Sequence, residues 1–224
     1  MPRLVLFDID GTVLTFRGPA PGPGRMALDR AMHEQYGLER ATEHLRVAGG
    51  TDLALARTLL GRAGVAADDA AIESLLDSYL EHLRAVLETR QYHPVGDVQG
   101  AVAKLRQHGV MVGLATGNVR RGAELKLASA GLSSTFHLDH GGFGSDAEIR
   151  ADIVRQAMAR CAMPQDASIV VVGDTEHDVR AGRAVGARVV GVATNERARA
   201  ELMAAGADAI VDTCGDALLR EVLA

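Results

Sequence analysis

Short apolar runs alternate with amphipathic segments from about residue 92 to the end of the sequence. Runs at 110–115, 168–172, 188–192 and 209–211 are aliphatic almost throughout, which is typical of strands buried on both faces of a sheet. We also expect a short strand near Phe136. Helical spacing predicts helices at 98–106, 147–161 and 179–185, and a helix that ends at Ser129 before Gly131. Together with the apolar run at 4–7, this alternation predicts an α/β domain built on a parallel sheet with helices on both faces.

The pattern changes between about residues 25 and 90, where apolar positions recur at helical spacing and no strand is indicated. The clearest helix carries Ile72, Leu75, Leu76, Tyr79, Leu83 and Leu87, preceded by the possible N-caps Asp68 and Asp69. A Pro- and Gly-rich connector at 17–24 precedes this region and interrupts regular structure. We therefore expect an α/β core domain formed by residues 1–16 and 92–224, with a helical domain inserted at 17–91.

Composition narrows the classes of function. The 224 residues are 47% hydrophobic, enough for a substantial core, whereas aromatic residues make up 3% and the net charge is -5. A nucleic-acid partner is therefore not expected, because such proteins present basic surfaces and stacking side chains. Cys161 and Cys214 lack metal-ligand spacing and are expected to be reduced. Without a leader-like segment or a long apolar run, we expect a cytoplasmic protein with no membrane partner. The oligomeric state stays open.

Two carboxylates follow the first apolar run. Asp8 and Asp10 are two positions apart on an extended backbone, so both side chains point to the same side of the strand. One member of such a pair can attack a substrate or hold a metal while the other moves a proton. An acidic strand end that runs into a turn is the alternative for this motif taken alone.

Two further strands end in polar motifs. The run at 110–115 leads into Thr116-Gly117-Asn118, and the run at 168–172 leads into Gly173-Asp174-Thr175-Glu176-His177-Asp178. Ligands bind beyond the carboxyl ends of parallel strands, so these motifs are expected to meet Asp8 and Asp10. A hydroxyl group and backbone N–H groups suit phosphoryl oxygens, whereas carboxylates suit a hard cation such as Mg2+. His177 is expected to be a solvent-facing spacer.

These three motifs, in this order and each after an apolar strand, resemble the haloacid dehalogenase-like hydrolase superfamily, and in particular its phosphoglycolate phosphatase-like members. The similarity covers essentially the whole chain. It implies a Rossmann-like α/β core with a helical cap, and a Mg2+-dependent phosphatase that hydrolyses a small phosphorylated metabolite through an aspartyl-phosphate. Asp10 favours a phosphatase over a dehalogenase, because cleavage of an ester benefits from an acid that protonates the leaving group.

The resemblance also implies a role for each motif residue. Asp8 is the nucleophile, and Asp10 is the general acid and then the general base. Mg2+ is bound by Asp8, the backbone carbonyl of Asp10 and Asp174, with Asp178 supporting the site. The phosphoryl group is held by Thr116, Gly117 and Asn118.

The position of the active-site cation departs from the family pattern. Relatives generally place a lysine about two dozen residues before the acidic metal motif, and here Arg150 is the positional match. Arginine keeps the charge and adds a fork that fits phosphate. Lys126, on the helix after Thr116, is the competing candidate, and a surface charge on an amphipathic helix is the alternative for either residue. We favour Arg150.

A second departure lies in the inserted helical domain. Gly50-Thr51-Asp52 resembles a substrate-specificity loop in which relatives often carry a basic residue before the threonine. Gly50 stands at that place, and Arg46 could substitute for the missing charge. Thr51 or Asp52 could equally be the N-cap of a helix that starts near residue 53, and both roles can hold together.

Two other functions compete with a phosphatase. A phosphomutase uses the same aspartyl-phosphate but returns the phosphoryl group to its substrate. A phospho-accepting signalling module also phosphorylates an aspartate beside Mg2+, although the helical insert and the position of Asp8 on the first strand disfavour it. The sequence leaves the identity of the substrate open.

Overall fold

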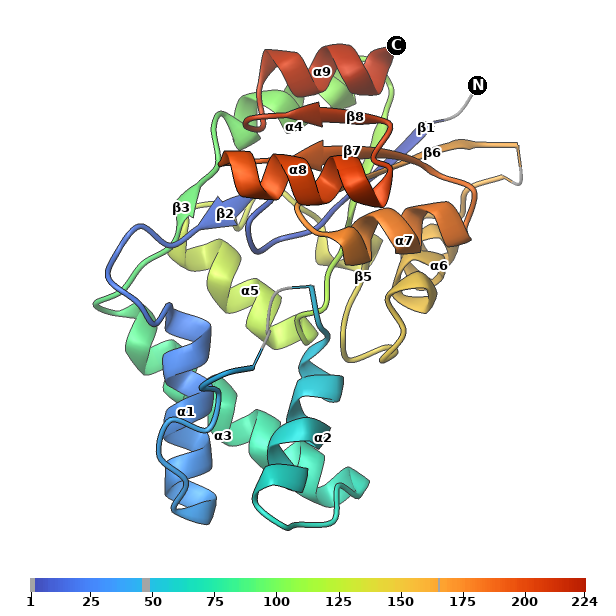
Figure 1. Ribbon diagram of the computed structural model, residues 1–224. Helices are drawn as coiled ribbons and strands as arrows, with labels where there is room; N and C mark the ends of the chain where they lie inside the picture. Colours follow the sequence, from blue (N-terminus) through green and yellow to red (C-terminus); the bar gives the residue numbers. More distant parts are fainter. Residues whose placement is uncertain (1–2, 46–48, 165) are drawn as a thin grey trace.

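The computed structural model describes residues 3–45, 49–164 and 166–224, and a parallel sheet forms its centre (Figure 1). Six strands lie in the order β5-β4-β1-β6-β7-β8. Their bounds are Arg3–Phe7 (β1), Met111–Ala115 (β4), Gly141–Gly142 (β5), Ser168–Gly173 (β6), Arg188–Val192 (β7) and Ala209–Val211 (β8). β1 is hydrogen-bonded to β4 on one side and to β6 on the other, in parallel register. The α/β class predicted from the sequence is confirmed.

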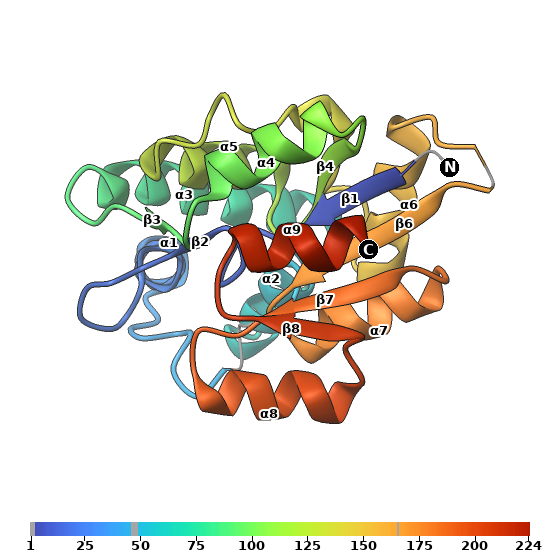
Figure 2. The ribbon, with the colours of Figure 1, turned by 90° about the horizontal axis from the view of Figure 1, so that it is seen from above.

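Helices cover both faces of the sheet (Figure 2). One face packs against α4 (Val98–Gln107), α5 (Arg120–Ser129) and α9 (Asp216–Leu223). The other packs against α6 (Arg150–Arg160), α7 (Glu176–Ala184) and α8 (Glu196–Ala205). The sequence of β1 is apolar from Leu4 to its end because both of its faces are buried. Val5 and Phe7 face the first group of helices, whereas Leu4 and Leu6 face the second.

Three further helices lie together below the sheet in Figure 1: α1 (Pro23–Tyr36), α2 (Asp52–Arg62) and α3 (Asp69–Leu87). The apolar face of α3, including Leu75, Tyr79 and Leu83, is buried in the same core cluster as residues of α1 and α2. Asp68 caps α3, since its carboxylate accepts a hydrogen bond from Ala71 N–H at 2.9 Å. Asp69 is the first helical residue rather than the cap.

A two-stranded ribbon marks the place where the chain leaves the sheet and returns to it. β2 (Leu14–Thr15) pairs antiparallel with β3 (His93–Pro94), so the segments before α1 and after α3 are tied side by side. Strands of two residues leave no recognisable pattern in a sequence, and we did not predict them. The division into residues 1–16 with 92–224 and residues 17–91 stays a prediction.

The predicted strand near Phe136 is wrong. Phe136 lies in an irregular segment and packs its buried ring against Phe7 of β1, with ring centroids 5.7 Å apart. The sheet continues with β5 instead, after a short 3-10 turn at Leu138–His140. Cys161 and Cys214 are free and buried, as expected of reduced thiols. Among the described residues, no helix is long and apolar enough to cross a membrane; the cytoplasmic location stays a prediction.

Candidate active site

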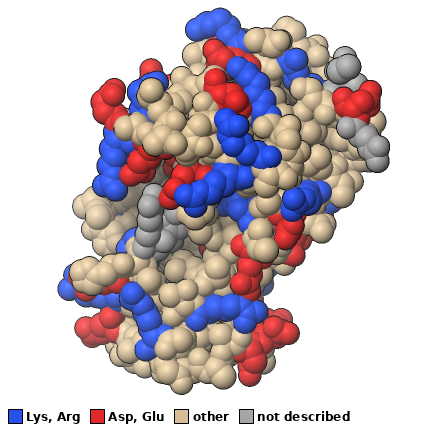
Figure 3. Space-filling view, turned by 45° about the vertical axis from the view of Figure 1, so that its right-hand side comes forward, with Lys and Arg blue, Asp and Glu red and all other residues tan. Residues whose placement is uncertain are grey.

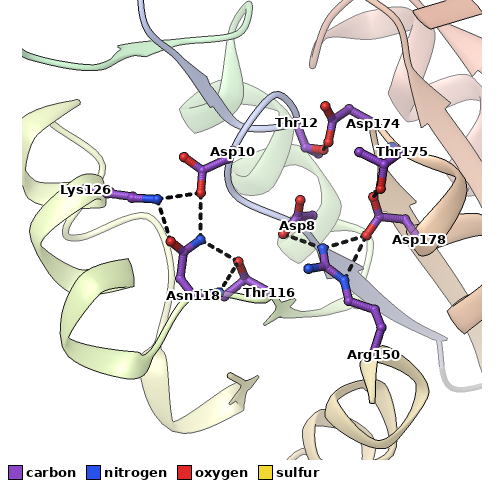
Figure 4. Close-up of polar contacts among 10 residues, drawn as sticks. All are labelled: Asp8, Asp10, Thr12, Thr116, Asn118, Lys126, Arg150, Asp174, Thr175 and Asp178. Atoms are coloured by element: carbon purple, nitrogen blue, oxygen red, sulfur yellow. Dashed lines mark hydrogen bonds and ion pairs between the residues drawn. The ribbon is translucent and has the colours of Figure 1, made fainter. Parts of the chain in front are cut away.

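The three polar motifs meet beyond the carboxyl ends of three adjacent strands. Asp8 and Asp10 follow β1, residues 116–118 follow β4, and residues 174–178 follow β6 (Figure 4). They border a cavity of 340 Å³. From the sheet side this cavity is lined by Asp8, Asp10, Thr116, Gly117, Asn118, Lys126, Arg150, Asp174 and Thr175, and from the helices below it by Arg25, Leu28, Gly49, Gly50, Asp52 and Tyr79.

Three carboxylates form a cluster beside this cavity. Asp8, Asp174 and Asp178 each offer an oxygen, and these oxygens lie within 4.8 Å of one another. Burial raises the pKa of Asp8 to about 7, with further increases from Asp178 and Asp10 that the Arg150 guanidinium partly opposes. Burial and the charges of Asp178 and Asp8 likewise raise the pKa of Asp174 well above its usual range.

The cluster fits a hard divalent cation. All its donors are oxygens, and Asp8 Oδ1 is a buried atom without a well-oriented hydrogen bond, although Arg150 Nη2 lies 2.7 Å away. Packed carboxylates of like charge are costly unless a cation neutralises them. Gly11 makes this packing possible for two reasons. Its φ of +82° lies in the left-handed region that favours glycine, and a Cβ added to it would lie 2.0 Å from Asp174 Oδ2. The Asp10 side chain lies apart from the cluster, paired with Lys126.

Asp178 is held from two directions. Its Oδ2 accepts a hydrogen bond from the backbone N–H of Thr175 at 3.0 Å, which belongs to the capping box of α7, and a second one from the Thr175 hydroxyl at 2.7 Å. Its Oδ1 accepts bonds from Arg150 Nε at 3.1 Å and Nη2 at 2.6 Å. Both oxygens are therefore engaged, an arrangement suited to orienting Arg150 and supporting a metal site.

Arg150, at the start of α6, lies between Asp8 and Asp178 (Figure 4). The guanidinium is buried, and although desolvation alone would lower its pKa, the charges of Asp178 and Asp8 raise that pKa. An arginine can bridge two carboxylates because its planar fork carries five N–H donors. This position places a permanent positive charge beside the carboxylate predicted to be the nucleophile.

Lys126 lies in the same site, with different partners. The alternative that it is a surface charge is wrong, because its side chain is 7% exposed. Nζ donates to Asp10 Oδ2 at 2.8 Å and to Asn118 Oδ1 at 2.5 Å. Burial opposes the charge of Lys126, but Asp10, Tyr79, Tyr92 and Asp52 together outweigh it, so the pKa of Lys126 lies well above its usual value. The two cations are thus divided: Arg150 pairs with Asp8, and Lys126 pairs with Asp10.

Thr116 and Asn118 connect the loop after β4 to the acid pair. Asn118 Nδ2 donates to Asp10 Oδ2 at 2.7 Å and to Thr116 Oγ1 at 2.8 Å, and Asn118 N–H also donates to this oxygen at 3.3 Å. Because the Thr116 oxygen already accepts two hydrogen bonds, its own proton is left to donate into the cavity. A hydroxyl donor of this kind suits an anionic oxygen.

The loop before α2 is hydrogen-bonded to the loop after β4. Asp52 N–H donates to Gly117 O at 2.8 Å, and Asp52 Oδ2 accepts from Val119 N–H at 2.8 Å, which caps α5. The backbone of Gly50 lies so close that a Cβ on Gly117 would be 2.1 Å from Gly50 O. This contact joins the inserted helices to the motif predicted to bind phosphate.

Thr51 is the N-cap of α2, as one of the sequence alternatives predicted. Its Oγ1 accepts from Ala54 N–H at 3.3 Å and lies 3.3 Å from the Glu148 carbonyl, to which it donates. Asp52 is the first residue of α2 and caps α5 instead. Arg46, considered above as a substitute cation, lies outside the described residues. His177 is half-buried rather than solvent-facing, because its ring packs against Gly49.

Comparison with known proteins agrees with this geometry. Residues 2–186 match the family model described as haloacid dehalogenase-like hydrolase. The chain belongs to the haloacid dehalogenase-like hydrolases. It is 30% identical to a phosphoglycolate phosphatase of Synechococcus elongatus over an alignment of 220 residues, and this alignment covers 96% of this chain and 95% of the relative. A phosphoglycolate phosphatase of Xanthomonas campestris is 32% identical over 197 residues, covering 83% of this chain and 80% of the relative. Family and relatives together support a phosphatase enzyme.

Solved structures share the fold of this haloacid dehalogenase-like hydrolase. A hydrolase from Pseudomonas syringae superposes with a TM-score of 0.73 at 20% identity, covering 99% of each chain. A predicted phosphatase from Clostridium acetobutylicum gives 0.72 at 19% identity, covering 100% of this chain and 99% of the other. The Rossmann-like core with helices on both faces is confirmed.

Sequence reasoning missed several residues of this hydrolase's cavity. Thr175 could have been found, because a threonine three residues before Asp178 resembles a capping box. Thr12 does not line the cavity, but its hydroxyl donates to Asp174 Oδ1 at 3.4 Å, and its place two residues after Asp10 could have suggested this contact. Arg25 and Tyr79 carry no comparable signal, since only the folding of α1 and α3 against the sheet brings them to the cavity.

Proposed function

We propose that this hydrolase is a Mg2+-dependent phosphatase that cleaves a small phosphate monoester, with Asp8 as nucleophile. The observation that carries the proposal is the position of Asp8 on the cavity wall, where it is paired with the Arg150 guanidinium and clustered with the carboxylates of Asp174 and Asp178. An anionic nucleophile approaches an anionic phosphate only where cations and N–H donors offset their repulsion.

The metal would be held by Asp8, Asp174 and the backbone carbonyl of Asp10, with Asp178 supporting the site. When bound, it would neutralise charge on Asp8 and on the phosphoryl group. Asp8 would then attack phosphorus, forming a bond between its carboxylate oxygen and phosphorus while the bond from phosphorus to the ester oxygen breaks. Arg150 would keep Asp8 oriented and charged, as its ion pair at 2.7 Å indicates.

Asp10 would move the proton in both halves of the reaction. As a carboxylic acid it would donate to the departing alcohol oxygen, and as a carboxylate it would accept a proton from the water that hydrolyses the aspartyl-phosphate. Lys126 and Asn118 support this role by holding Asp10 Oδ2 at 2.8 Å and 2.7 Å. Thr116, Gly117 and Asn118 would bind the phosphoryl oxygens, since their loop borders the cavity.

The inserted helices, residues 17–91, would act as a cap over this site. Arg25, Gly50 and Tyr79 close the cavity from that side, and the hydrogen bonds of Asp52 to Gly117 and Val119 fix the contact. A cavity of 340 Å³ suits a short substrate. The two curated relatives suggest phosphoglycolate as the first compound to assay.

Steady-state release of inorganic phosphate tests the proposal. Purified protein with Mg2+ should turn over an aryl phosphate and members of a panel of small phosphate monoesters many times per active site. Stoichiometric phosphorylation without turnover would replace the proposal with a signalling module. Transfer of the phosphoryl group back to a sugar phosphate, without release of phosphate, would replace it with a phosphomutase.

A further inference from the structure

Arg25 lies on α1 and brings a positive charge to the active-site cavity. It lines the cavity from the inserted helices, on the side opposite the sheet that carries Asp8 and Asp10. The first turn of α1 lies next to Lys126: a Cβ on Gly24 would be 3.8 Å from Lys126 Nζ. Arg25 follows Gly24 directly and lines the same cavity as Thr116, Gly117 and Asn118, the proposed phosphoryl-binding residues. None of the steps proposed above uses this residue.

The Arg25 guanidinium is held in place by the chain following α1. Nη1 donates to the carbonyl of Thr42 at 2.9 Å, and Nη2 donates to the carbonyl of Leu45. Each of these nitrogens carries a second N–H, and Nε carries another. The group is thus oriented by two carbonyls and keeps donors for a further partner.

The structure, over the residues it describes, also leaves the charge of Arg25 unpaired. Lys126 faces Asp10, and Arg150 faces Asp8 and Asp178. By contrast, no carboxylate within the described parts of the chain forms an ion pair with Arg25, whose hydrogen bonds go to the two neutral carbonyls. From the same helices the cavity is lined by Leu28 and Tyr79, which carry no charge at neutral pH, and by Asp52, whose Oδ2 already accepts a hydrogen bond from Val119 N–H.

We propose that Arg25 binds a carboxylate of the substrate, so that the enzyme selects short phosphorylated acids over uncharged phosphate esters. This inference rests on the proposed phosphatase function and specifies its substrate class. A guanidinium and a carboxylate can form two parallel hydrogen bonds, which fixes orientation as well as adding attraction. Arg25 and the phosphoryl-binding residues line one cavity of 340 Å³, which has room for a small phosphorylated acid.

The test compares two substrates of nearly equal size, phosphoglycolate and ethyl phosphate, in wild type and in Arg25→Gln. We expect Arg25→Gln to lower kcat/KM for phosphoglycolate by about 10- to 100-fold, mainly through KM, since a hydrogen bond to a charged group contributes about 1.5–3 kcal/mol. Turnover of ethyl phosphate should change little. Arg25→Lys should recover part of the loss, because an ammonium keeps the charge without the fork.

Arg62 provides the matched control. Its Nη1 donates to the carbonyls of Ala41 and Glu43 at 3.0 Å each, so it ties down the same segment as Arg25, yet it does not line the cavity. Arg62→Gln should therefore leave the preference for phosphoglycolate unchanged. An Arg46→Gln variant tests the other basic residue of this segment.

Three outcomes would overturn the inference: equal losses for both esters in Arg25→Gln, a wild type that does not prefer phosphoglycolate, or a selective loss in Arg46→Gln but not in Arg25→Gln. These results differ from a failure of the proposed function, in which wild-type protein would hydrolyse neither ester.

Discussion

Removing the Arg150 guanidinium should disable the site, because it is the cation that the structure places beside Asp8. Its Nη2 lies 2.7 Å from Asp8 and 2.6 Å from Asp178, and the side chains of all three residues are less than a tenth exposed. Truncating one member of a buried, hydrogen-bonded charge pair costs about 2–5 kcal/mol. We therefore expect Arg150→Met to lower kcat/KM by about 30- to 4,000-fold, at roughly 1.4 kcal/mol for each factor of ten.

The same variant should change the pH profile in a way that a general loss of stability would not. Arg150 lowers the pKa of Asp8, so its removal raises that pKa further. The nucleophile must be ionised to attack, and the acidic limb of kcat/KM should therefore move to higher pH in Arg150→Met. Arg150→Lys should move it less and recover part of the activity, because one ammonium is poorly shaped to bridge two carboxylates.

The assay is kcat/KM between pH 5 and 9 on one good substrate at saturating Mg2+, with folding monitored by circular dichroism and urea denaturation. Arg155→Met is the control, since Arg155 lies on the same helix in an exposed pair with Asp152, and such pairs contribute about 0–1 kcal/mol. The reasoning is refuted if Arg150→Met is no more impaired than Arg155→Met, or if its acidic limb stays in place.

Four other results are expected. Asp8→Asn should abolish turnover, and Asp10→Asn should slow it by about 10²- to 10⁴-fold because proton transfer is lost. Both rates are measured as phosphate release, and a near-normal rate would contradict the role of nucleophile for Asp8 or of general acid and base for Asp10. Chelation should remove activity and Mg2+, rather than Zn2+, should restore it, because the ligands are oxygens; undiminished turnover after verified metal removal would count against the site. Asp52→Ala should raise KM or lower kcat by loosening the contact with Gly117 and Val119, whereas Asp52→Asn keeps the acceptor and should be milder; equal effects would argue against this contact. Without metal, the free energy of unfolding should fall as the pH rises from about 4 to 7, because the folded state holds the Asp8 proton, with a pKa of about 7, more tightly than the unfolded chain does. Asp8→Asn should reduce this slope in urea denaturation and leave the part due to Asp174, whose pKa burial also raises; an unchanged slope would contradict the reasoning.

The position of the candidate site was predictable because it follows from strands that each carry their own signal. The apolar runs before Asp8, Thr116 and Gly173 each identify a buried strand, and parallel topology requires their carboxyl ends to lie on one edge. The structure makes them neighbours in the order β4-β1-β6. The helix α9 was also readable, since Leu218, Leu219 and Val222 recur at helical spacing, but the prediction overlooked it.

Features that depend on contacts between distant segments were not predictable. Lys126 resembles a surface residue in its own helix, and only the packing of α5 against the inserted helices buries it next to Asp10. Asp52 was expected to cap its own helix or to contact substrate, yet it caps α5 in a contact that spans 67 residues of sequence. The preference for Arg150 over Lys126 rested on spacing, and the geometry instead gives each cation its own aspartate.

Trapping the phosphorylated enzyme tests the central claim most directly. In the Asp10→Asn variant, Asp8 should still attack the substrate, but the intermediate should be hydrolysed slowly. The aspartyl-phosphate should therefore accumulate during the reaction and be preserved by an acid quench. Borohydride reduction followed by peptide mass spectrometry should then find homoserine in place of Asp8, in proportion to the phosphoryl group bound. Steady turnover by wild type with no modification at Asp8, or with the modification at another carboxylate, would contradict the account.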